Sequence, residues 1–219
     1  MSGSISNILN IIFLIIFLEA AYIDCRNAER HGRRFLKPAL MPLLIVVYCT
    51  GMIEAGGSVS VFMILALACG FAGDTLLLKE KYFTFGLAAF LLEHIFLIIE
   101  FTRGITFSEI PVIILAAIVL YALAGWLILR GLLPAIDRNM KAPVFLYMTA
   151  ILMMSYTSLL RFSQTDMNSF LCAFIGSLLF ITSDSILAYN VFLKKSDRLV
   201  METYLAAQFL IATGMILAV

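Results

Sequence analysis

The sequence contains very little charge. Only 13% of its 219 residues are Asp, Glu, Lys or Arg, whereas 63% are hydrophobic and the mean hydropathy is +1.04. Soluble domains carry about twice that charged fraction, about 25%. The scarcity of charge therefore excludes a water-soluble domain and predicts a chain solvated by lipid. The net charge of +1 also excludes the basic surface with which proteins bind nucleic acid.

Histidine and paired cysteine are also scarce. The chain has two histidines, His31 and His94, and four cysteines without a CxxC pair. Intramembrane zinc hydrolases use several histidine ligands, so this inventory predicts neither a metal site nor a cofactor. A GxSxG motif is missing as well, which disfavours hydrolysis by a serine nucleophile.

Long hydrophobic runs separated by short polar turns make up the rest of the chain. They predict about eight helices, at residues 5–23, 37–54, 59–78, 83–101, 109–130, 143–160, 168–192 and 199–218. A spanning helix needs about 20 apolar residues, so these runs fill residues 1–219 and predict a single transmembrane domain. The predicted fold class is an all-α, polytopic integral membrane helical bundle. No basic residue precedes the first run and no small-residue cleavage site follows it, so we interpret it as a span rather than a signal peptide.

The Lys and Arg residues are distributed unevenly between the two sides of the predicted bundle. The loops after the first, third, fifth and seventh helices hold 13 of them, and the other side holds Arg103 and Arg161. Basic loops stay in the cytoplasm, so the split predicts eight spans with both termini non-cytoplasmic. In a bacterium the membrane would be the cytoplasmic (inner) one.

Two segments of the sequence are similar to each other. Residues 73–78 read GDTLLL and residues 183–188 read SDSILA, and the helix before each begins with a basic residue and a proline, at Lys37-Pro38 and at Lys141-Ala142-Pro143. The pattern predicts a weak 4+4 internal duplication in which the helices of Asp74 and Asp184 run in the same direction. We therefore expect both aspartates toward the cytoplasmic end, where they can share one cavity.

Ionisable residues inside the predicted spans are few. Each costs about 2.5 to 3.5 kcal/mol at the centre of a membrane helix, so each needs a partner, a cavity or a function. Asp74 and Asp184 are the catalytic candidates because they are paired by motif and by depth. The supporting candidates are Glu19, Lys37, His94, Tyr204 and Gln208, and Glu93 and Glu202 also carry charge within predicted helices.

Each candidate has a structural alternative. The two aspartates can accept hydrogen bonds from neighbouring hydroxyl groups and hold helices together, and His94 can be either a proton shuttle or a packing residue. Lys37 can bind a substrate phosphate or extend its ammonium group to the membrane surface, and Glu19 can simply meet cytoplasmic water.

A pair of buried carboxyl groups has a defined chemistry. Desolvation and mutual repulsion keep one carboxyl protonated, so it can act as a general acid while the other acts as a base. This arrangement suits hydrolysis through an oxocarbenium ion.

The pattern of residues resembles the YhhN family of integral membrane proteins, which includes the lysoplasmalogenases. The shared elements run through most of the chain: Lys37-Pro38, Met41-Pro42, Gly73-Asp74, Leu77, Gly86, Phe90, His94, Pro143, Tyr147, Met154, Gly176, Phe180, residues 183–188, Asn190, Phe192, Tyr204 and Gln208. One departure is that the family usually has a tyrosine a few residues after the histidine, where Ile95, Phe96 and Leu97 stand here.

The resemblance implies hydrolysis of the vinyl ether bond of lysoplasmalogens, without a metal, to a fatty aldehyde and glycerophosphoethanolamine or glycerophosphocholine. One of Asp74 and Asp184 would be the acid, and the other would orient water and stabilise the cation. Ser183 and Asn190 would support the site, and the substrate phosphate would lie near Lys37. The implied partners are a lysophospholipid substrate and the bilayer, and the sequence makes no prediction of oligomeric state.

Three other functions fit parts of the sequence. Duplicated halves with buried carboxylates are typical of proton-coupled transporters of small molecules or lipids, although mid-membrane Gly or Pro breaks in paired helices are not evident. An intramembrane aspartyl protease also needs two aspartates, but residues 70–74 read GFAGD rather than GxGD. A lipid-binding scaffold would use the aspartates only to join helices.

Overall fold

The computed structural model describes residues 2–26, 33–193 and 198–219, and the side chains of residues 11–23, 39–193 and 199–219. Its helices are α1 Ser2–Arg26, α2 Arg33–Glu54, α3 Val61–Leu76, α4 Phe83–Thr102, α5 Val112–Ala116, α6 Ile118–Leu132, α7 Lys141–Leu160, α8 Met167–Leu193 and α9 Arg198–Ile216. Short 3-10 turns lie at Glu80–Tyr82, Phe107–Glu109, Leu133–Ala135, Arg138–Met140 and Arg161–Ser163. These described residues contain no strand, so the all-α prediction is confirmed.

Within the described ranges, five helical segments are long and apolar enough to cross a membrane. They are Glu80–Thr102, Val112–Leu132, Arg138–Ser163, Met167–Leu193 and Leu199–Ile216, and three shorter apolar helices cover Ile11–Ile23, Ala39–Glu54 and Val61–Leu76. A helix satisfies all its backbone hydrogen bonds internally, which lipid requires. The chain is therefore a multi-pass membrane protein. Eight crossings, the duplication and the orientation of the termini stay predictions.

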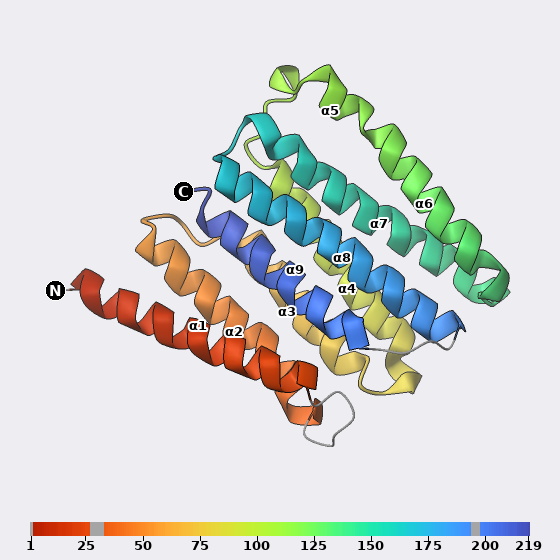
Figure 1. The fold of residues 1–219 in the computed structure, drawn as a ribbon, viewed down its shortest axis with the longest axis horizontal. Coiled ribbons are helices and arrows are strands. Elements are labelled where there is room, and N and C mark those ends of the chain that lie inside the picture. The colour runs from red at the N-terminus through yellow and green to blue at the C-terminus, as the bar shows by residue number, and fades with distance from the viewer. Residues whose placement is uncertain (1, 27–32, 194–197) are drawn as a thin grey trace.

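The helices lie side by side and alternate in direction (Figure 1). The α4 helix packs against α3 and α7, α8 packs against α7 and α9, and α2 packs against α1, α3 and α9. In Figure 1, α3 and α4 pass behind α8 and α9, α1 forms one edge, and α5 with α6 forms the other. The middle of the bundle, where α3, α4, α7, α8 and α9 meet, is thus covered on every side by apolar helices.

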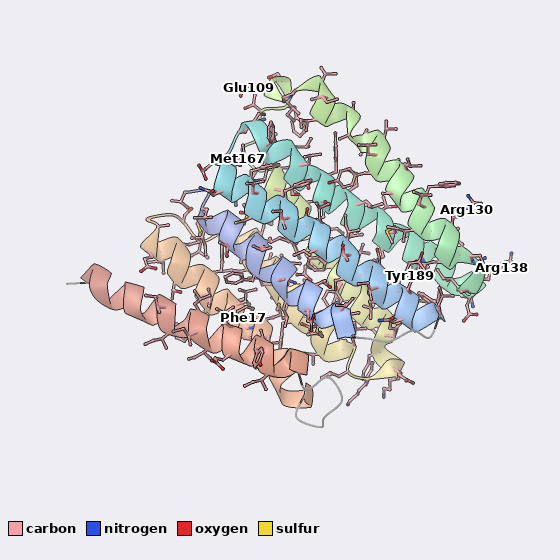
Figure 2. All side chains as sticks on the ribbon, in the orientation of Figure 1. Phe17, Glu109, Arg130, Arg138, Met167 and Tyr189 are labelled. Carbon is pink, nitrogen blue, oxygen red and sulfur yellow. The ribbon has the colours of Figure 1, made fainter. Side chains whose placement is uncertain are left out.

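The two ends of the bundle differ in charge. Arg130 and Arg138 lie at the end where α6 leads into α7, and Glu109 and Met167 lie at the opposite end (Figure 2). Lys79 and Lys81 follow α3 and so share the end of Arg130, which we call the basic end. Arg103 and Arg161 follow α4 and α7 at the opposite end, which is the separation that the sequence predicts.

The predicted helix at residues 109–130 is the one that the structure divides. It consists of α5 and α6, with a turn at Ala117 between them. The Leu115 carbonyl, beside this turn, accepts a hydrogen bond of 3.1 Å from the hydroxyl of Tyr156 on α7. A side chain that bonds to a backbone carbonyl in this way interrupts the helical ladder and bends the helix.

Glycines bring α8 and α9 close together. A Cβ at Gly176 would lie 2.9 Å from the Ala207 carbonyl oxygen, and a Cβ at Gly214 would lie 2.7 Å from the Ala173 amide nitrogen. The Ser169 hydroxyl then donates a hydrogen bond of 2.7 Å to the Gly214 carbonyl. Small residues allow such backbone contact between membrane helices, and here they fix α9 against α8.

Candidate active site

Asp184 of α8 is held by a tyrosine and a histidine from two other helices. The hydroxyl of Tyr147, on α7, donates a hydrogen bond to Asp184 Oδ2. His94 Nε2, on α4, lies 3.2 Å from the same hydroxyl and 3.5 Å from Asp184 Oδ2. Since the hydroxyl donates its hydrogen to the carboxylate, its oxygen can accept a hydrogen bond from His94 when Nε2 carries the ring hydrogen. The result is a continuous chain of polar atoms from His94 through Tyr147 to Asp184.

Asp74 of α3 belongs to a second polar group, which is formed with α4 and α9. The Tyr204 hydroxyl donates a hydrogen bond of 3.1 Å to Asp74 Oδ2. Gln208 lies one helical turn after Tyr204 on α9, and its Nε2 donates to Tyr204 Oη at 3.2 Å and to Glu93 Oε1 of α4. Asp74, Glu93, Tyr204 and Gln208 are all buried.

Aromatic rings join the two polar groups. Phe180 contacts His94 at a centroid distance of 4.8 Å and Tyr204 at 5.5 Å, edge-on in both cases. Phe90 makes a similar edge contact with Tyr204 at 5.8 Å. Phe180 therefore links the group of Asp184 to the group of Asp74 and fixes the orientation of the rings on both sides.

Two glycines of α3 make room for this arrangement. A Cβ at Gly73 would lie 2.6 Å from the ring of Phe90, and a Cβ at Gly70 would lie 3.0 Å from both carboxylate oxygens of Glu93. The small residues around Asp74 thus allow α4 to place Phe90 and Glu93 directly against α3.

Several buried polar atoms at this site have no hydrogen-bond partner in the described part of the chain: Glu93 Oε2, His94 Nδ1 and Gln208 Oε1. An unpaired buried polar atom costs free energy, so a ligand or water molecule that bonds to one of these atoms would be stabilised there.

Three carboxyl groups lie close enough to influence one another. Glu93 interacts electrostatically with both Asp74 and Asp184. Neighbouring carboxyl groups in a dry interior can hold a proton between them, which is the chemistry that a general acid needs. The described residues include no group of three or more His, Cys, Asp or Glu side chains arranged to hold a metal ion.

A narrow apolar pocket opens beside Asp184, between α4, α7 and α8. Its volume is about 40 Å³, which is well below the range of about 300 to 1,000 Å³ of small-molecule sites. Asp184 and Tyr147 are its polar groups, and its apolar lining is Leu77, Phe83, Leu87, Phe90, Val144, Met148, Leu187, Ala188, Val191 and Phe192. Asp74 is not part of the lining, so this pocket is not the shared cavity that the sequence predicts for the two aspartates.

The other predicted residues lie as follows. The Ser183 hydroxyl is directed away from the site, to the Val200 carbonyl of α9 at 3.0 Å. Glu19 and Glu202 are exposed at the surfaces of α1 and α9, and Asn190 is half-buried near the end of α8. The Lys37 backbone belongs to α2, but its side chain lies outside the described residues. The structure thus brings His94, Tyr204 and Gln208 to the aspartates and leaves Glu19 and Ser183 apart from them.

Two further residues belong to the site. Tyr147 contacts both Asp184 and His94, and Glu93 joins Gln208. Glu93 was recognisable as a charge within an apolar run, adjacent to His94. Tyr147 offered no such signal beyond its place in the family pattern.

Comparisons with known proteins show which family the chain is related to. The chain is similar to lysoplasmalogenase TMEM86B of Sus scrofa, with 32% identity over 178 residues that cover 78% of this chain and 71% of the relative. Lysoplasmalogenase TMEM86B of Mus musculus is 28% identical over 173 residues, which cover 78% of this chain and 70% of the relative. No solved structure matches the chain. The YhhN family model matches residues 32–215, which include both aspartates and the polar side chains bonded to them, and the chain therefore belongs to the YhhN family.

Proposed function

We propose that the protein is a lysoplasmalogenase-like hydrolase that cleaves the vinyl ether bond of a lysophospholipid. The observation that carries the proposal is the position of Asp184, which borders an apolar pocket and is hydrogen-bonded by Tyr147 beside His94. The relatives named above are lysoplasmalogenases, which supports this reaction class. They give no support to the transporter alternative.

The reaction needs one proton donor and one proton acceptor. Protonation of the outer vinyl carbon breaks the C=C π bond and leaves an oxocarbenium ion at the carbon that bears the ether oxygen. Water adds to this carbon and loses a proton, and the hemiacetal then collapses to a fatty aldehyde and the glycerol hydroxyl. Carboxyl groups are sufficient for these proton transfers, so we propose a reaction without a metal or cofactor.

We assign the proton transfers to Asp184. Both of its neighbours, Tyr147 and His94, lie at Oδ2, which leaves Oδ1 for the substrate or the attacking water. In this proposal Asp184, in its protonated form, delivers a proton to the vinyl carbon and then accepts one from water. Asp74 would stabilise the cation by its negative charge.

The pocket suggests how the substrate lies. Its apolar lining matches the chemistry of a single alkyl chain, and it reaches Leu77, Phe83 and Phe192 near the basic end of the bundle. Because the pocket holds only about 40 Å³, its side chains must move apart when such a chain enters. We propose that the substrate phosphate lies at that end, where Lys79, Lys81 and Lys37 follow or begin helices. Cationic side chains attract lipid phosphates at the membrane surface. The glycerol would then remain in the interface while the vinyl ether reaches Asp184.

The test is aldehyde release from a lysoplasmalogen by the purified protein in detergent, with excess EDTA present. We expect release by the wild type, and a fall of at least about 100-fold in Asp184→Asn, since acid–base catalysis contributes about 10² to 10⁴ in rate. Asp74→Asn should also lose activity. Asp137→Asn is the matched control, because Asp137 is exposed near α7 and away from the site.

Two results would contradict the proposal. One is a wild-type protein that folds but releases no aldehyde, and the other is an Asp184→Asn variant that keeps full turnover. If EDTA inhibits aldehyde release and added divalent metal restores it, the metal-independent mechanism is wrong.

A further inference from the structure

A polar cavity lies at the end of the bundle opposite the basic end. It is an open cavity of about 410 Å³, and the charged side chains that line it are Glu100, Arg103 and Arg161. Arg161 follows Tyr147 by 14 positions along α7 and the turn after it, which is about 21 Å at 1.5 Å per residue. The cavity is therefore distinct from the pocket at Asp184.

Arg161 is unusually placed for a charged side chain, because only 3% of its surface is exposed. Its Nη2 donates a hydrogen bond of 3.0 Å to Ser169 Oγ, and its guanidinium lies over the ring of Phe101, 5.7 Å from the centroid. Its Nη1 has no hydrogen-bond partner in the described residues. Packing against Phe101 and the bond to Ser169 hold the side chain in place at the edge of the cavity, where Nη1 is buried and unpaired in the described residues.

The carboxylate of Glu100, which lines the same cavity, is also held in place by hydrogen bonds. Glu100 Oε2 accepts hydrogen bonds from Ser60 Oγ at 2.5 Å and from Arg103 Nη1 at 3.3 Å. Glu100 is 12% exposed and interacts electrostatically with Arg161. The cavity therefore presents a fixed carboxylate and a fixed guanidinium with an unpaired donor, and with Arg103 its formal charge is +1.

These groups match a particular chemical class. A guanidinium binds a phosphate oxygen through directed N–H donors, and a buried, unpaired N–H gains most from such an acceptor. A phosphodiester carries a single negative charge, which the guanidinium groups of Arg161 and Arg103 can bind. The carboxylate of Glu100 can receive an ammonium group in the same ligand. Arg161 also lies where α7 ends, which is the depth of the lipid headgroups for a membrane-spanning helix.

We propose that this cavity binds the zwitterionic headgroup of a phospholipid of the ethanolamine type, with the phosphodiester at Arg161 and the ammonium at Glu100. The lipid belongs to the leaflet opposite the basic end. It is a structural or regulatory ligand, not the substrate bound at Asp184. Free glycerophosphoethanolamine has the same polar chemistry, so the experiment separates the two sources.

The experiment measures binding to purified protein in detergent by native mass spectrometry and by the shift in melting temperature. The probes are a diacyl phosphatidylethanolamine, glycerophosphoethanolamine, a phosphatidylglycerol and a diacylglycerol. None has a vinyl ether bond, so the result does not depend on the proposed hydrolysis. We expect tightest binding of phosphatidylethanolamine, weaker binding of phosphatidylglycerol and no specific binding of diacylglycerol.

The variants locate the site. Arg161→Gln should weaken phosphatidylethanolamine binding at least tenfold, Arg161→Lys should weaken it less, and Glu100→Gln should remove the preference over phosphatidylglycerol. Arg138→Gln, at the basic end, is the control and should bind as the wild type does. Because Arg161→Gln can destabilise the protein, Ser58→Trp provides a second test: Ser58 is exposed and lines the cavity, so the indole should block it and leave Arg161 intact.

Unchanged binding in both Arg161→Gln and Ser58→Trp would overturn the proposal. Equal affinity for glycerophosphoethanolamine and phosphatidylethanolamine would overturn the lipid as the source. Equal binding of phosphatidylglycerol and phosphatidylethanolamine by the wild type would overturn the role of Glu100.

Discussion

The hydroxyl of Tyr147 offers the sharpest test of the site. Tyr147→Phe keeps the buried ring and removes one oxygen, which donates to Asp184 Oδ2 and lies 3.2 Å from His94 Nε2. The substitution leaves no large cavity, so its effect reports the polar contacts alone. We expect kcat/KM to fall, because Asp184 loses the donor that orients it.

The size of the effect depends on the charge of Asp184. A hydrogen bond to a charged group contributes about 1.5 to 3 kcal/mol, whereas interhelical side-chain bonds in membrane proteins average about 0.6 kcal/mol. If the bond to a charged carboxylate is lost from the transition state, kcat/KM falls by about 10- to 150-fold. The free energy of unfolding should fall by the free energy of the lost bond, which is about 1.5 to 3 kcal/mol if Asp184 is charged and about 0.6 kcal/mol if it is not.

A double-mutant cycle measures the contact directly. Tyr147→Phe, Asp184→Asn and the double variant are compared with the wild type by unfolding in mixed micelles, followed by circular dichroism. We expect a coupling energy of about 1.5 to 3 kcal/mol. Tyr121→Phe with Asp184→Asn is the control cycle, because Tyr121 bonds to Ser155 at 3.0 Å, and its coupling should be close to zero.

A Tyr147–Asp184 coupling no larger than that of the control cycle, with aldehyde release unchanged in Tyr147→Phe, would refute this account of the site. The hydroxyl would then be a packing feature, and Asp184 would have to act without it.

Two glycines give further predictions. Gly70→Ala should lower the free energy of unfolding by about 1 to 3 kcal/mol and reduce activity, because its Cβ would lie 3.0 Å from both carboxylate oxygens of Glu93 and displace them from Gln208. Gly176→Ala should destabilise the protein by a similar amount without contacting the polar groups, because its Cβ would meet the backbone of α9 at 2.9 Å and 3.0 Å. Gly131→Ala is the control for both: its Cβ meets only the outer end of the Tyr189 side chain, so it should cost little or stabilise α6. Equal stability of all three variants, measured by unfolding in mixed micelles, would contradict the close helix contacts.

The sequence predicted the helices well because lipid imposes a simple requirement on them. Each apolar run must form a helix that satisfies its own backbone, so hydropathy alone places the ends of α3, α4, α7 and α8 within a few residues. The division between α5 and α6 was not predictable, since it lies beside a bond from Tyr156, which is distant in the sequence.

The site was predictable where a charge stood out against apolar neighbours. Asp74, Asp184 and His94 are conspicuous within their spans, and the structure places them in adjacent hydrogen-bonded groups, while their chemical roles stay predictions. Hydroxyl groups are not conspicuous in the same way. Tyr147 and Ser183 are both polar residues on membrane helices, and only their tertiary contacts show that Tyr147 turns toward Asp184 and Ser183 toward α9.

The segment Val112–Leu132 differs from the other long spans in what surrounds it. Only 6% of its most hydrophobic stretch is buried in the protein, against 61% for Arg138–Ser163. Its sequence is therefore selected by the bilayer more than by neighbouring side chains, and exchanges among Leu, Ile and Val there should be nearly neutral. A fluorescent reporter attached at Leu123, which is exposed, would sense lipid composition and leave the carboxyl groups undisturbed, so this edge of the bundle is the natural place to observe the protein in its membrane.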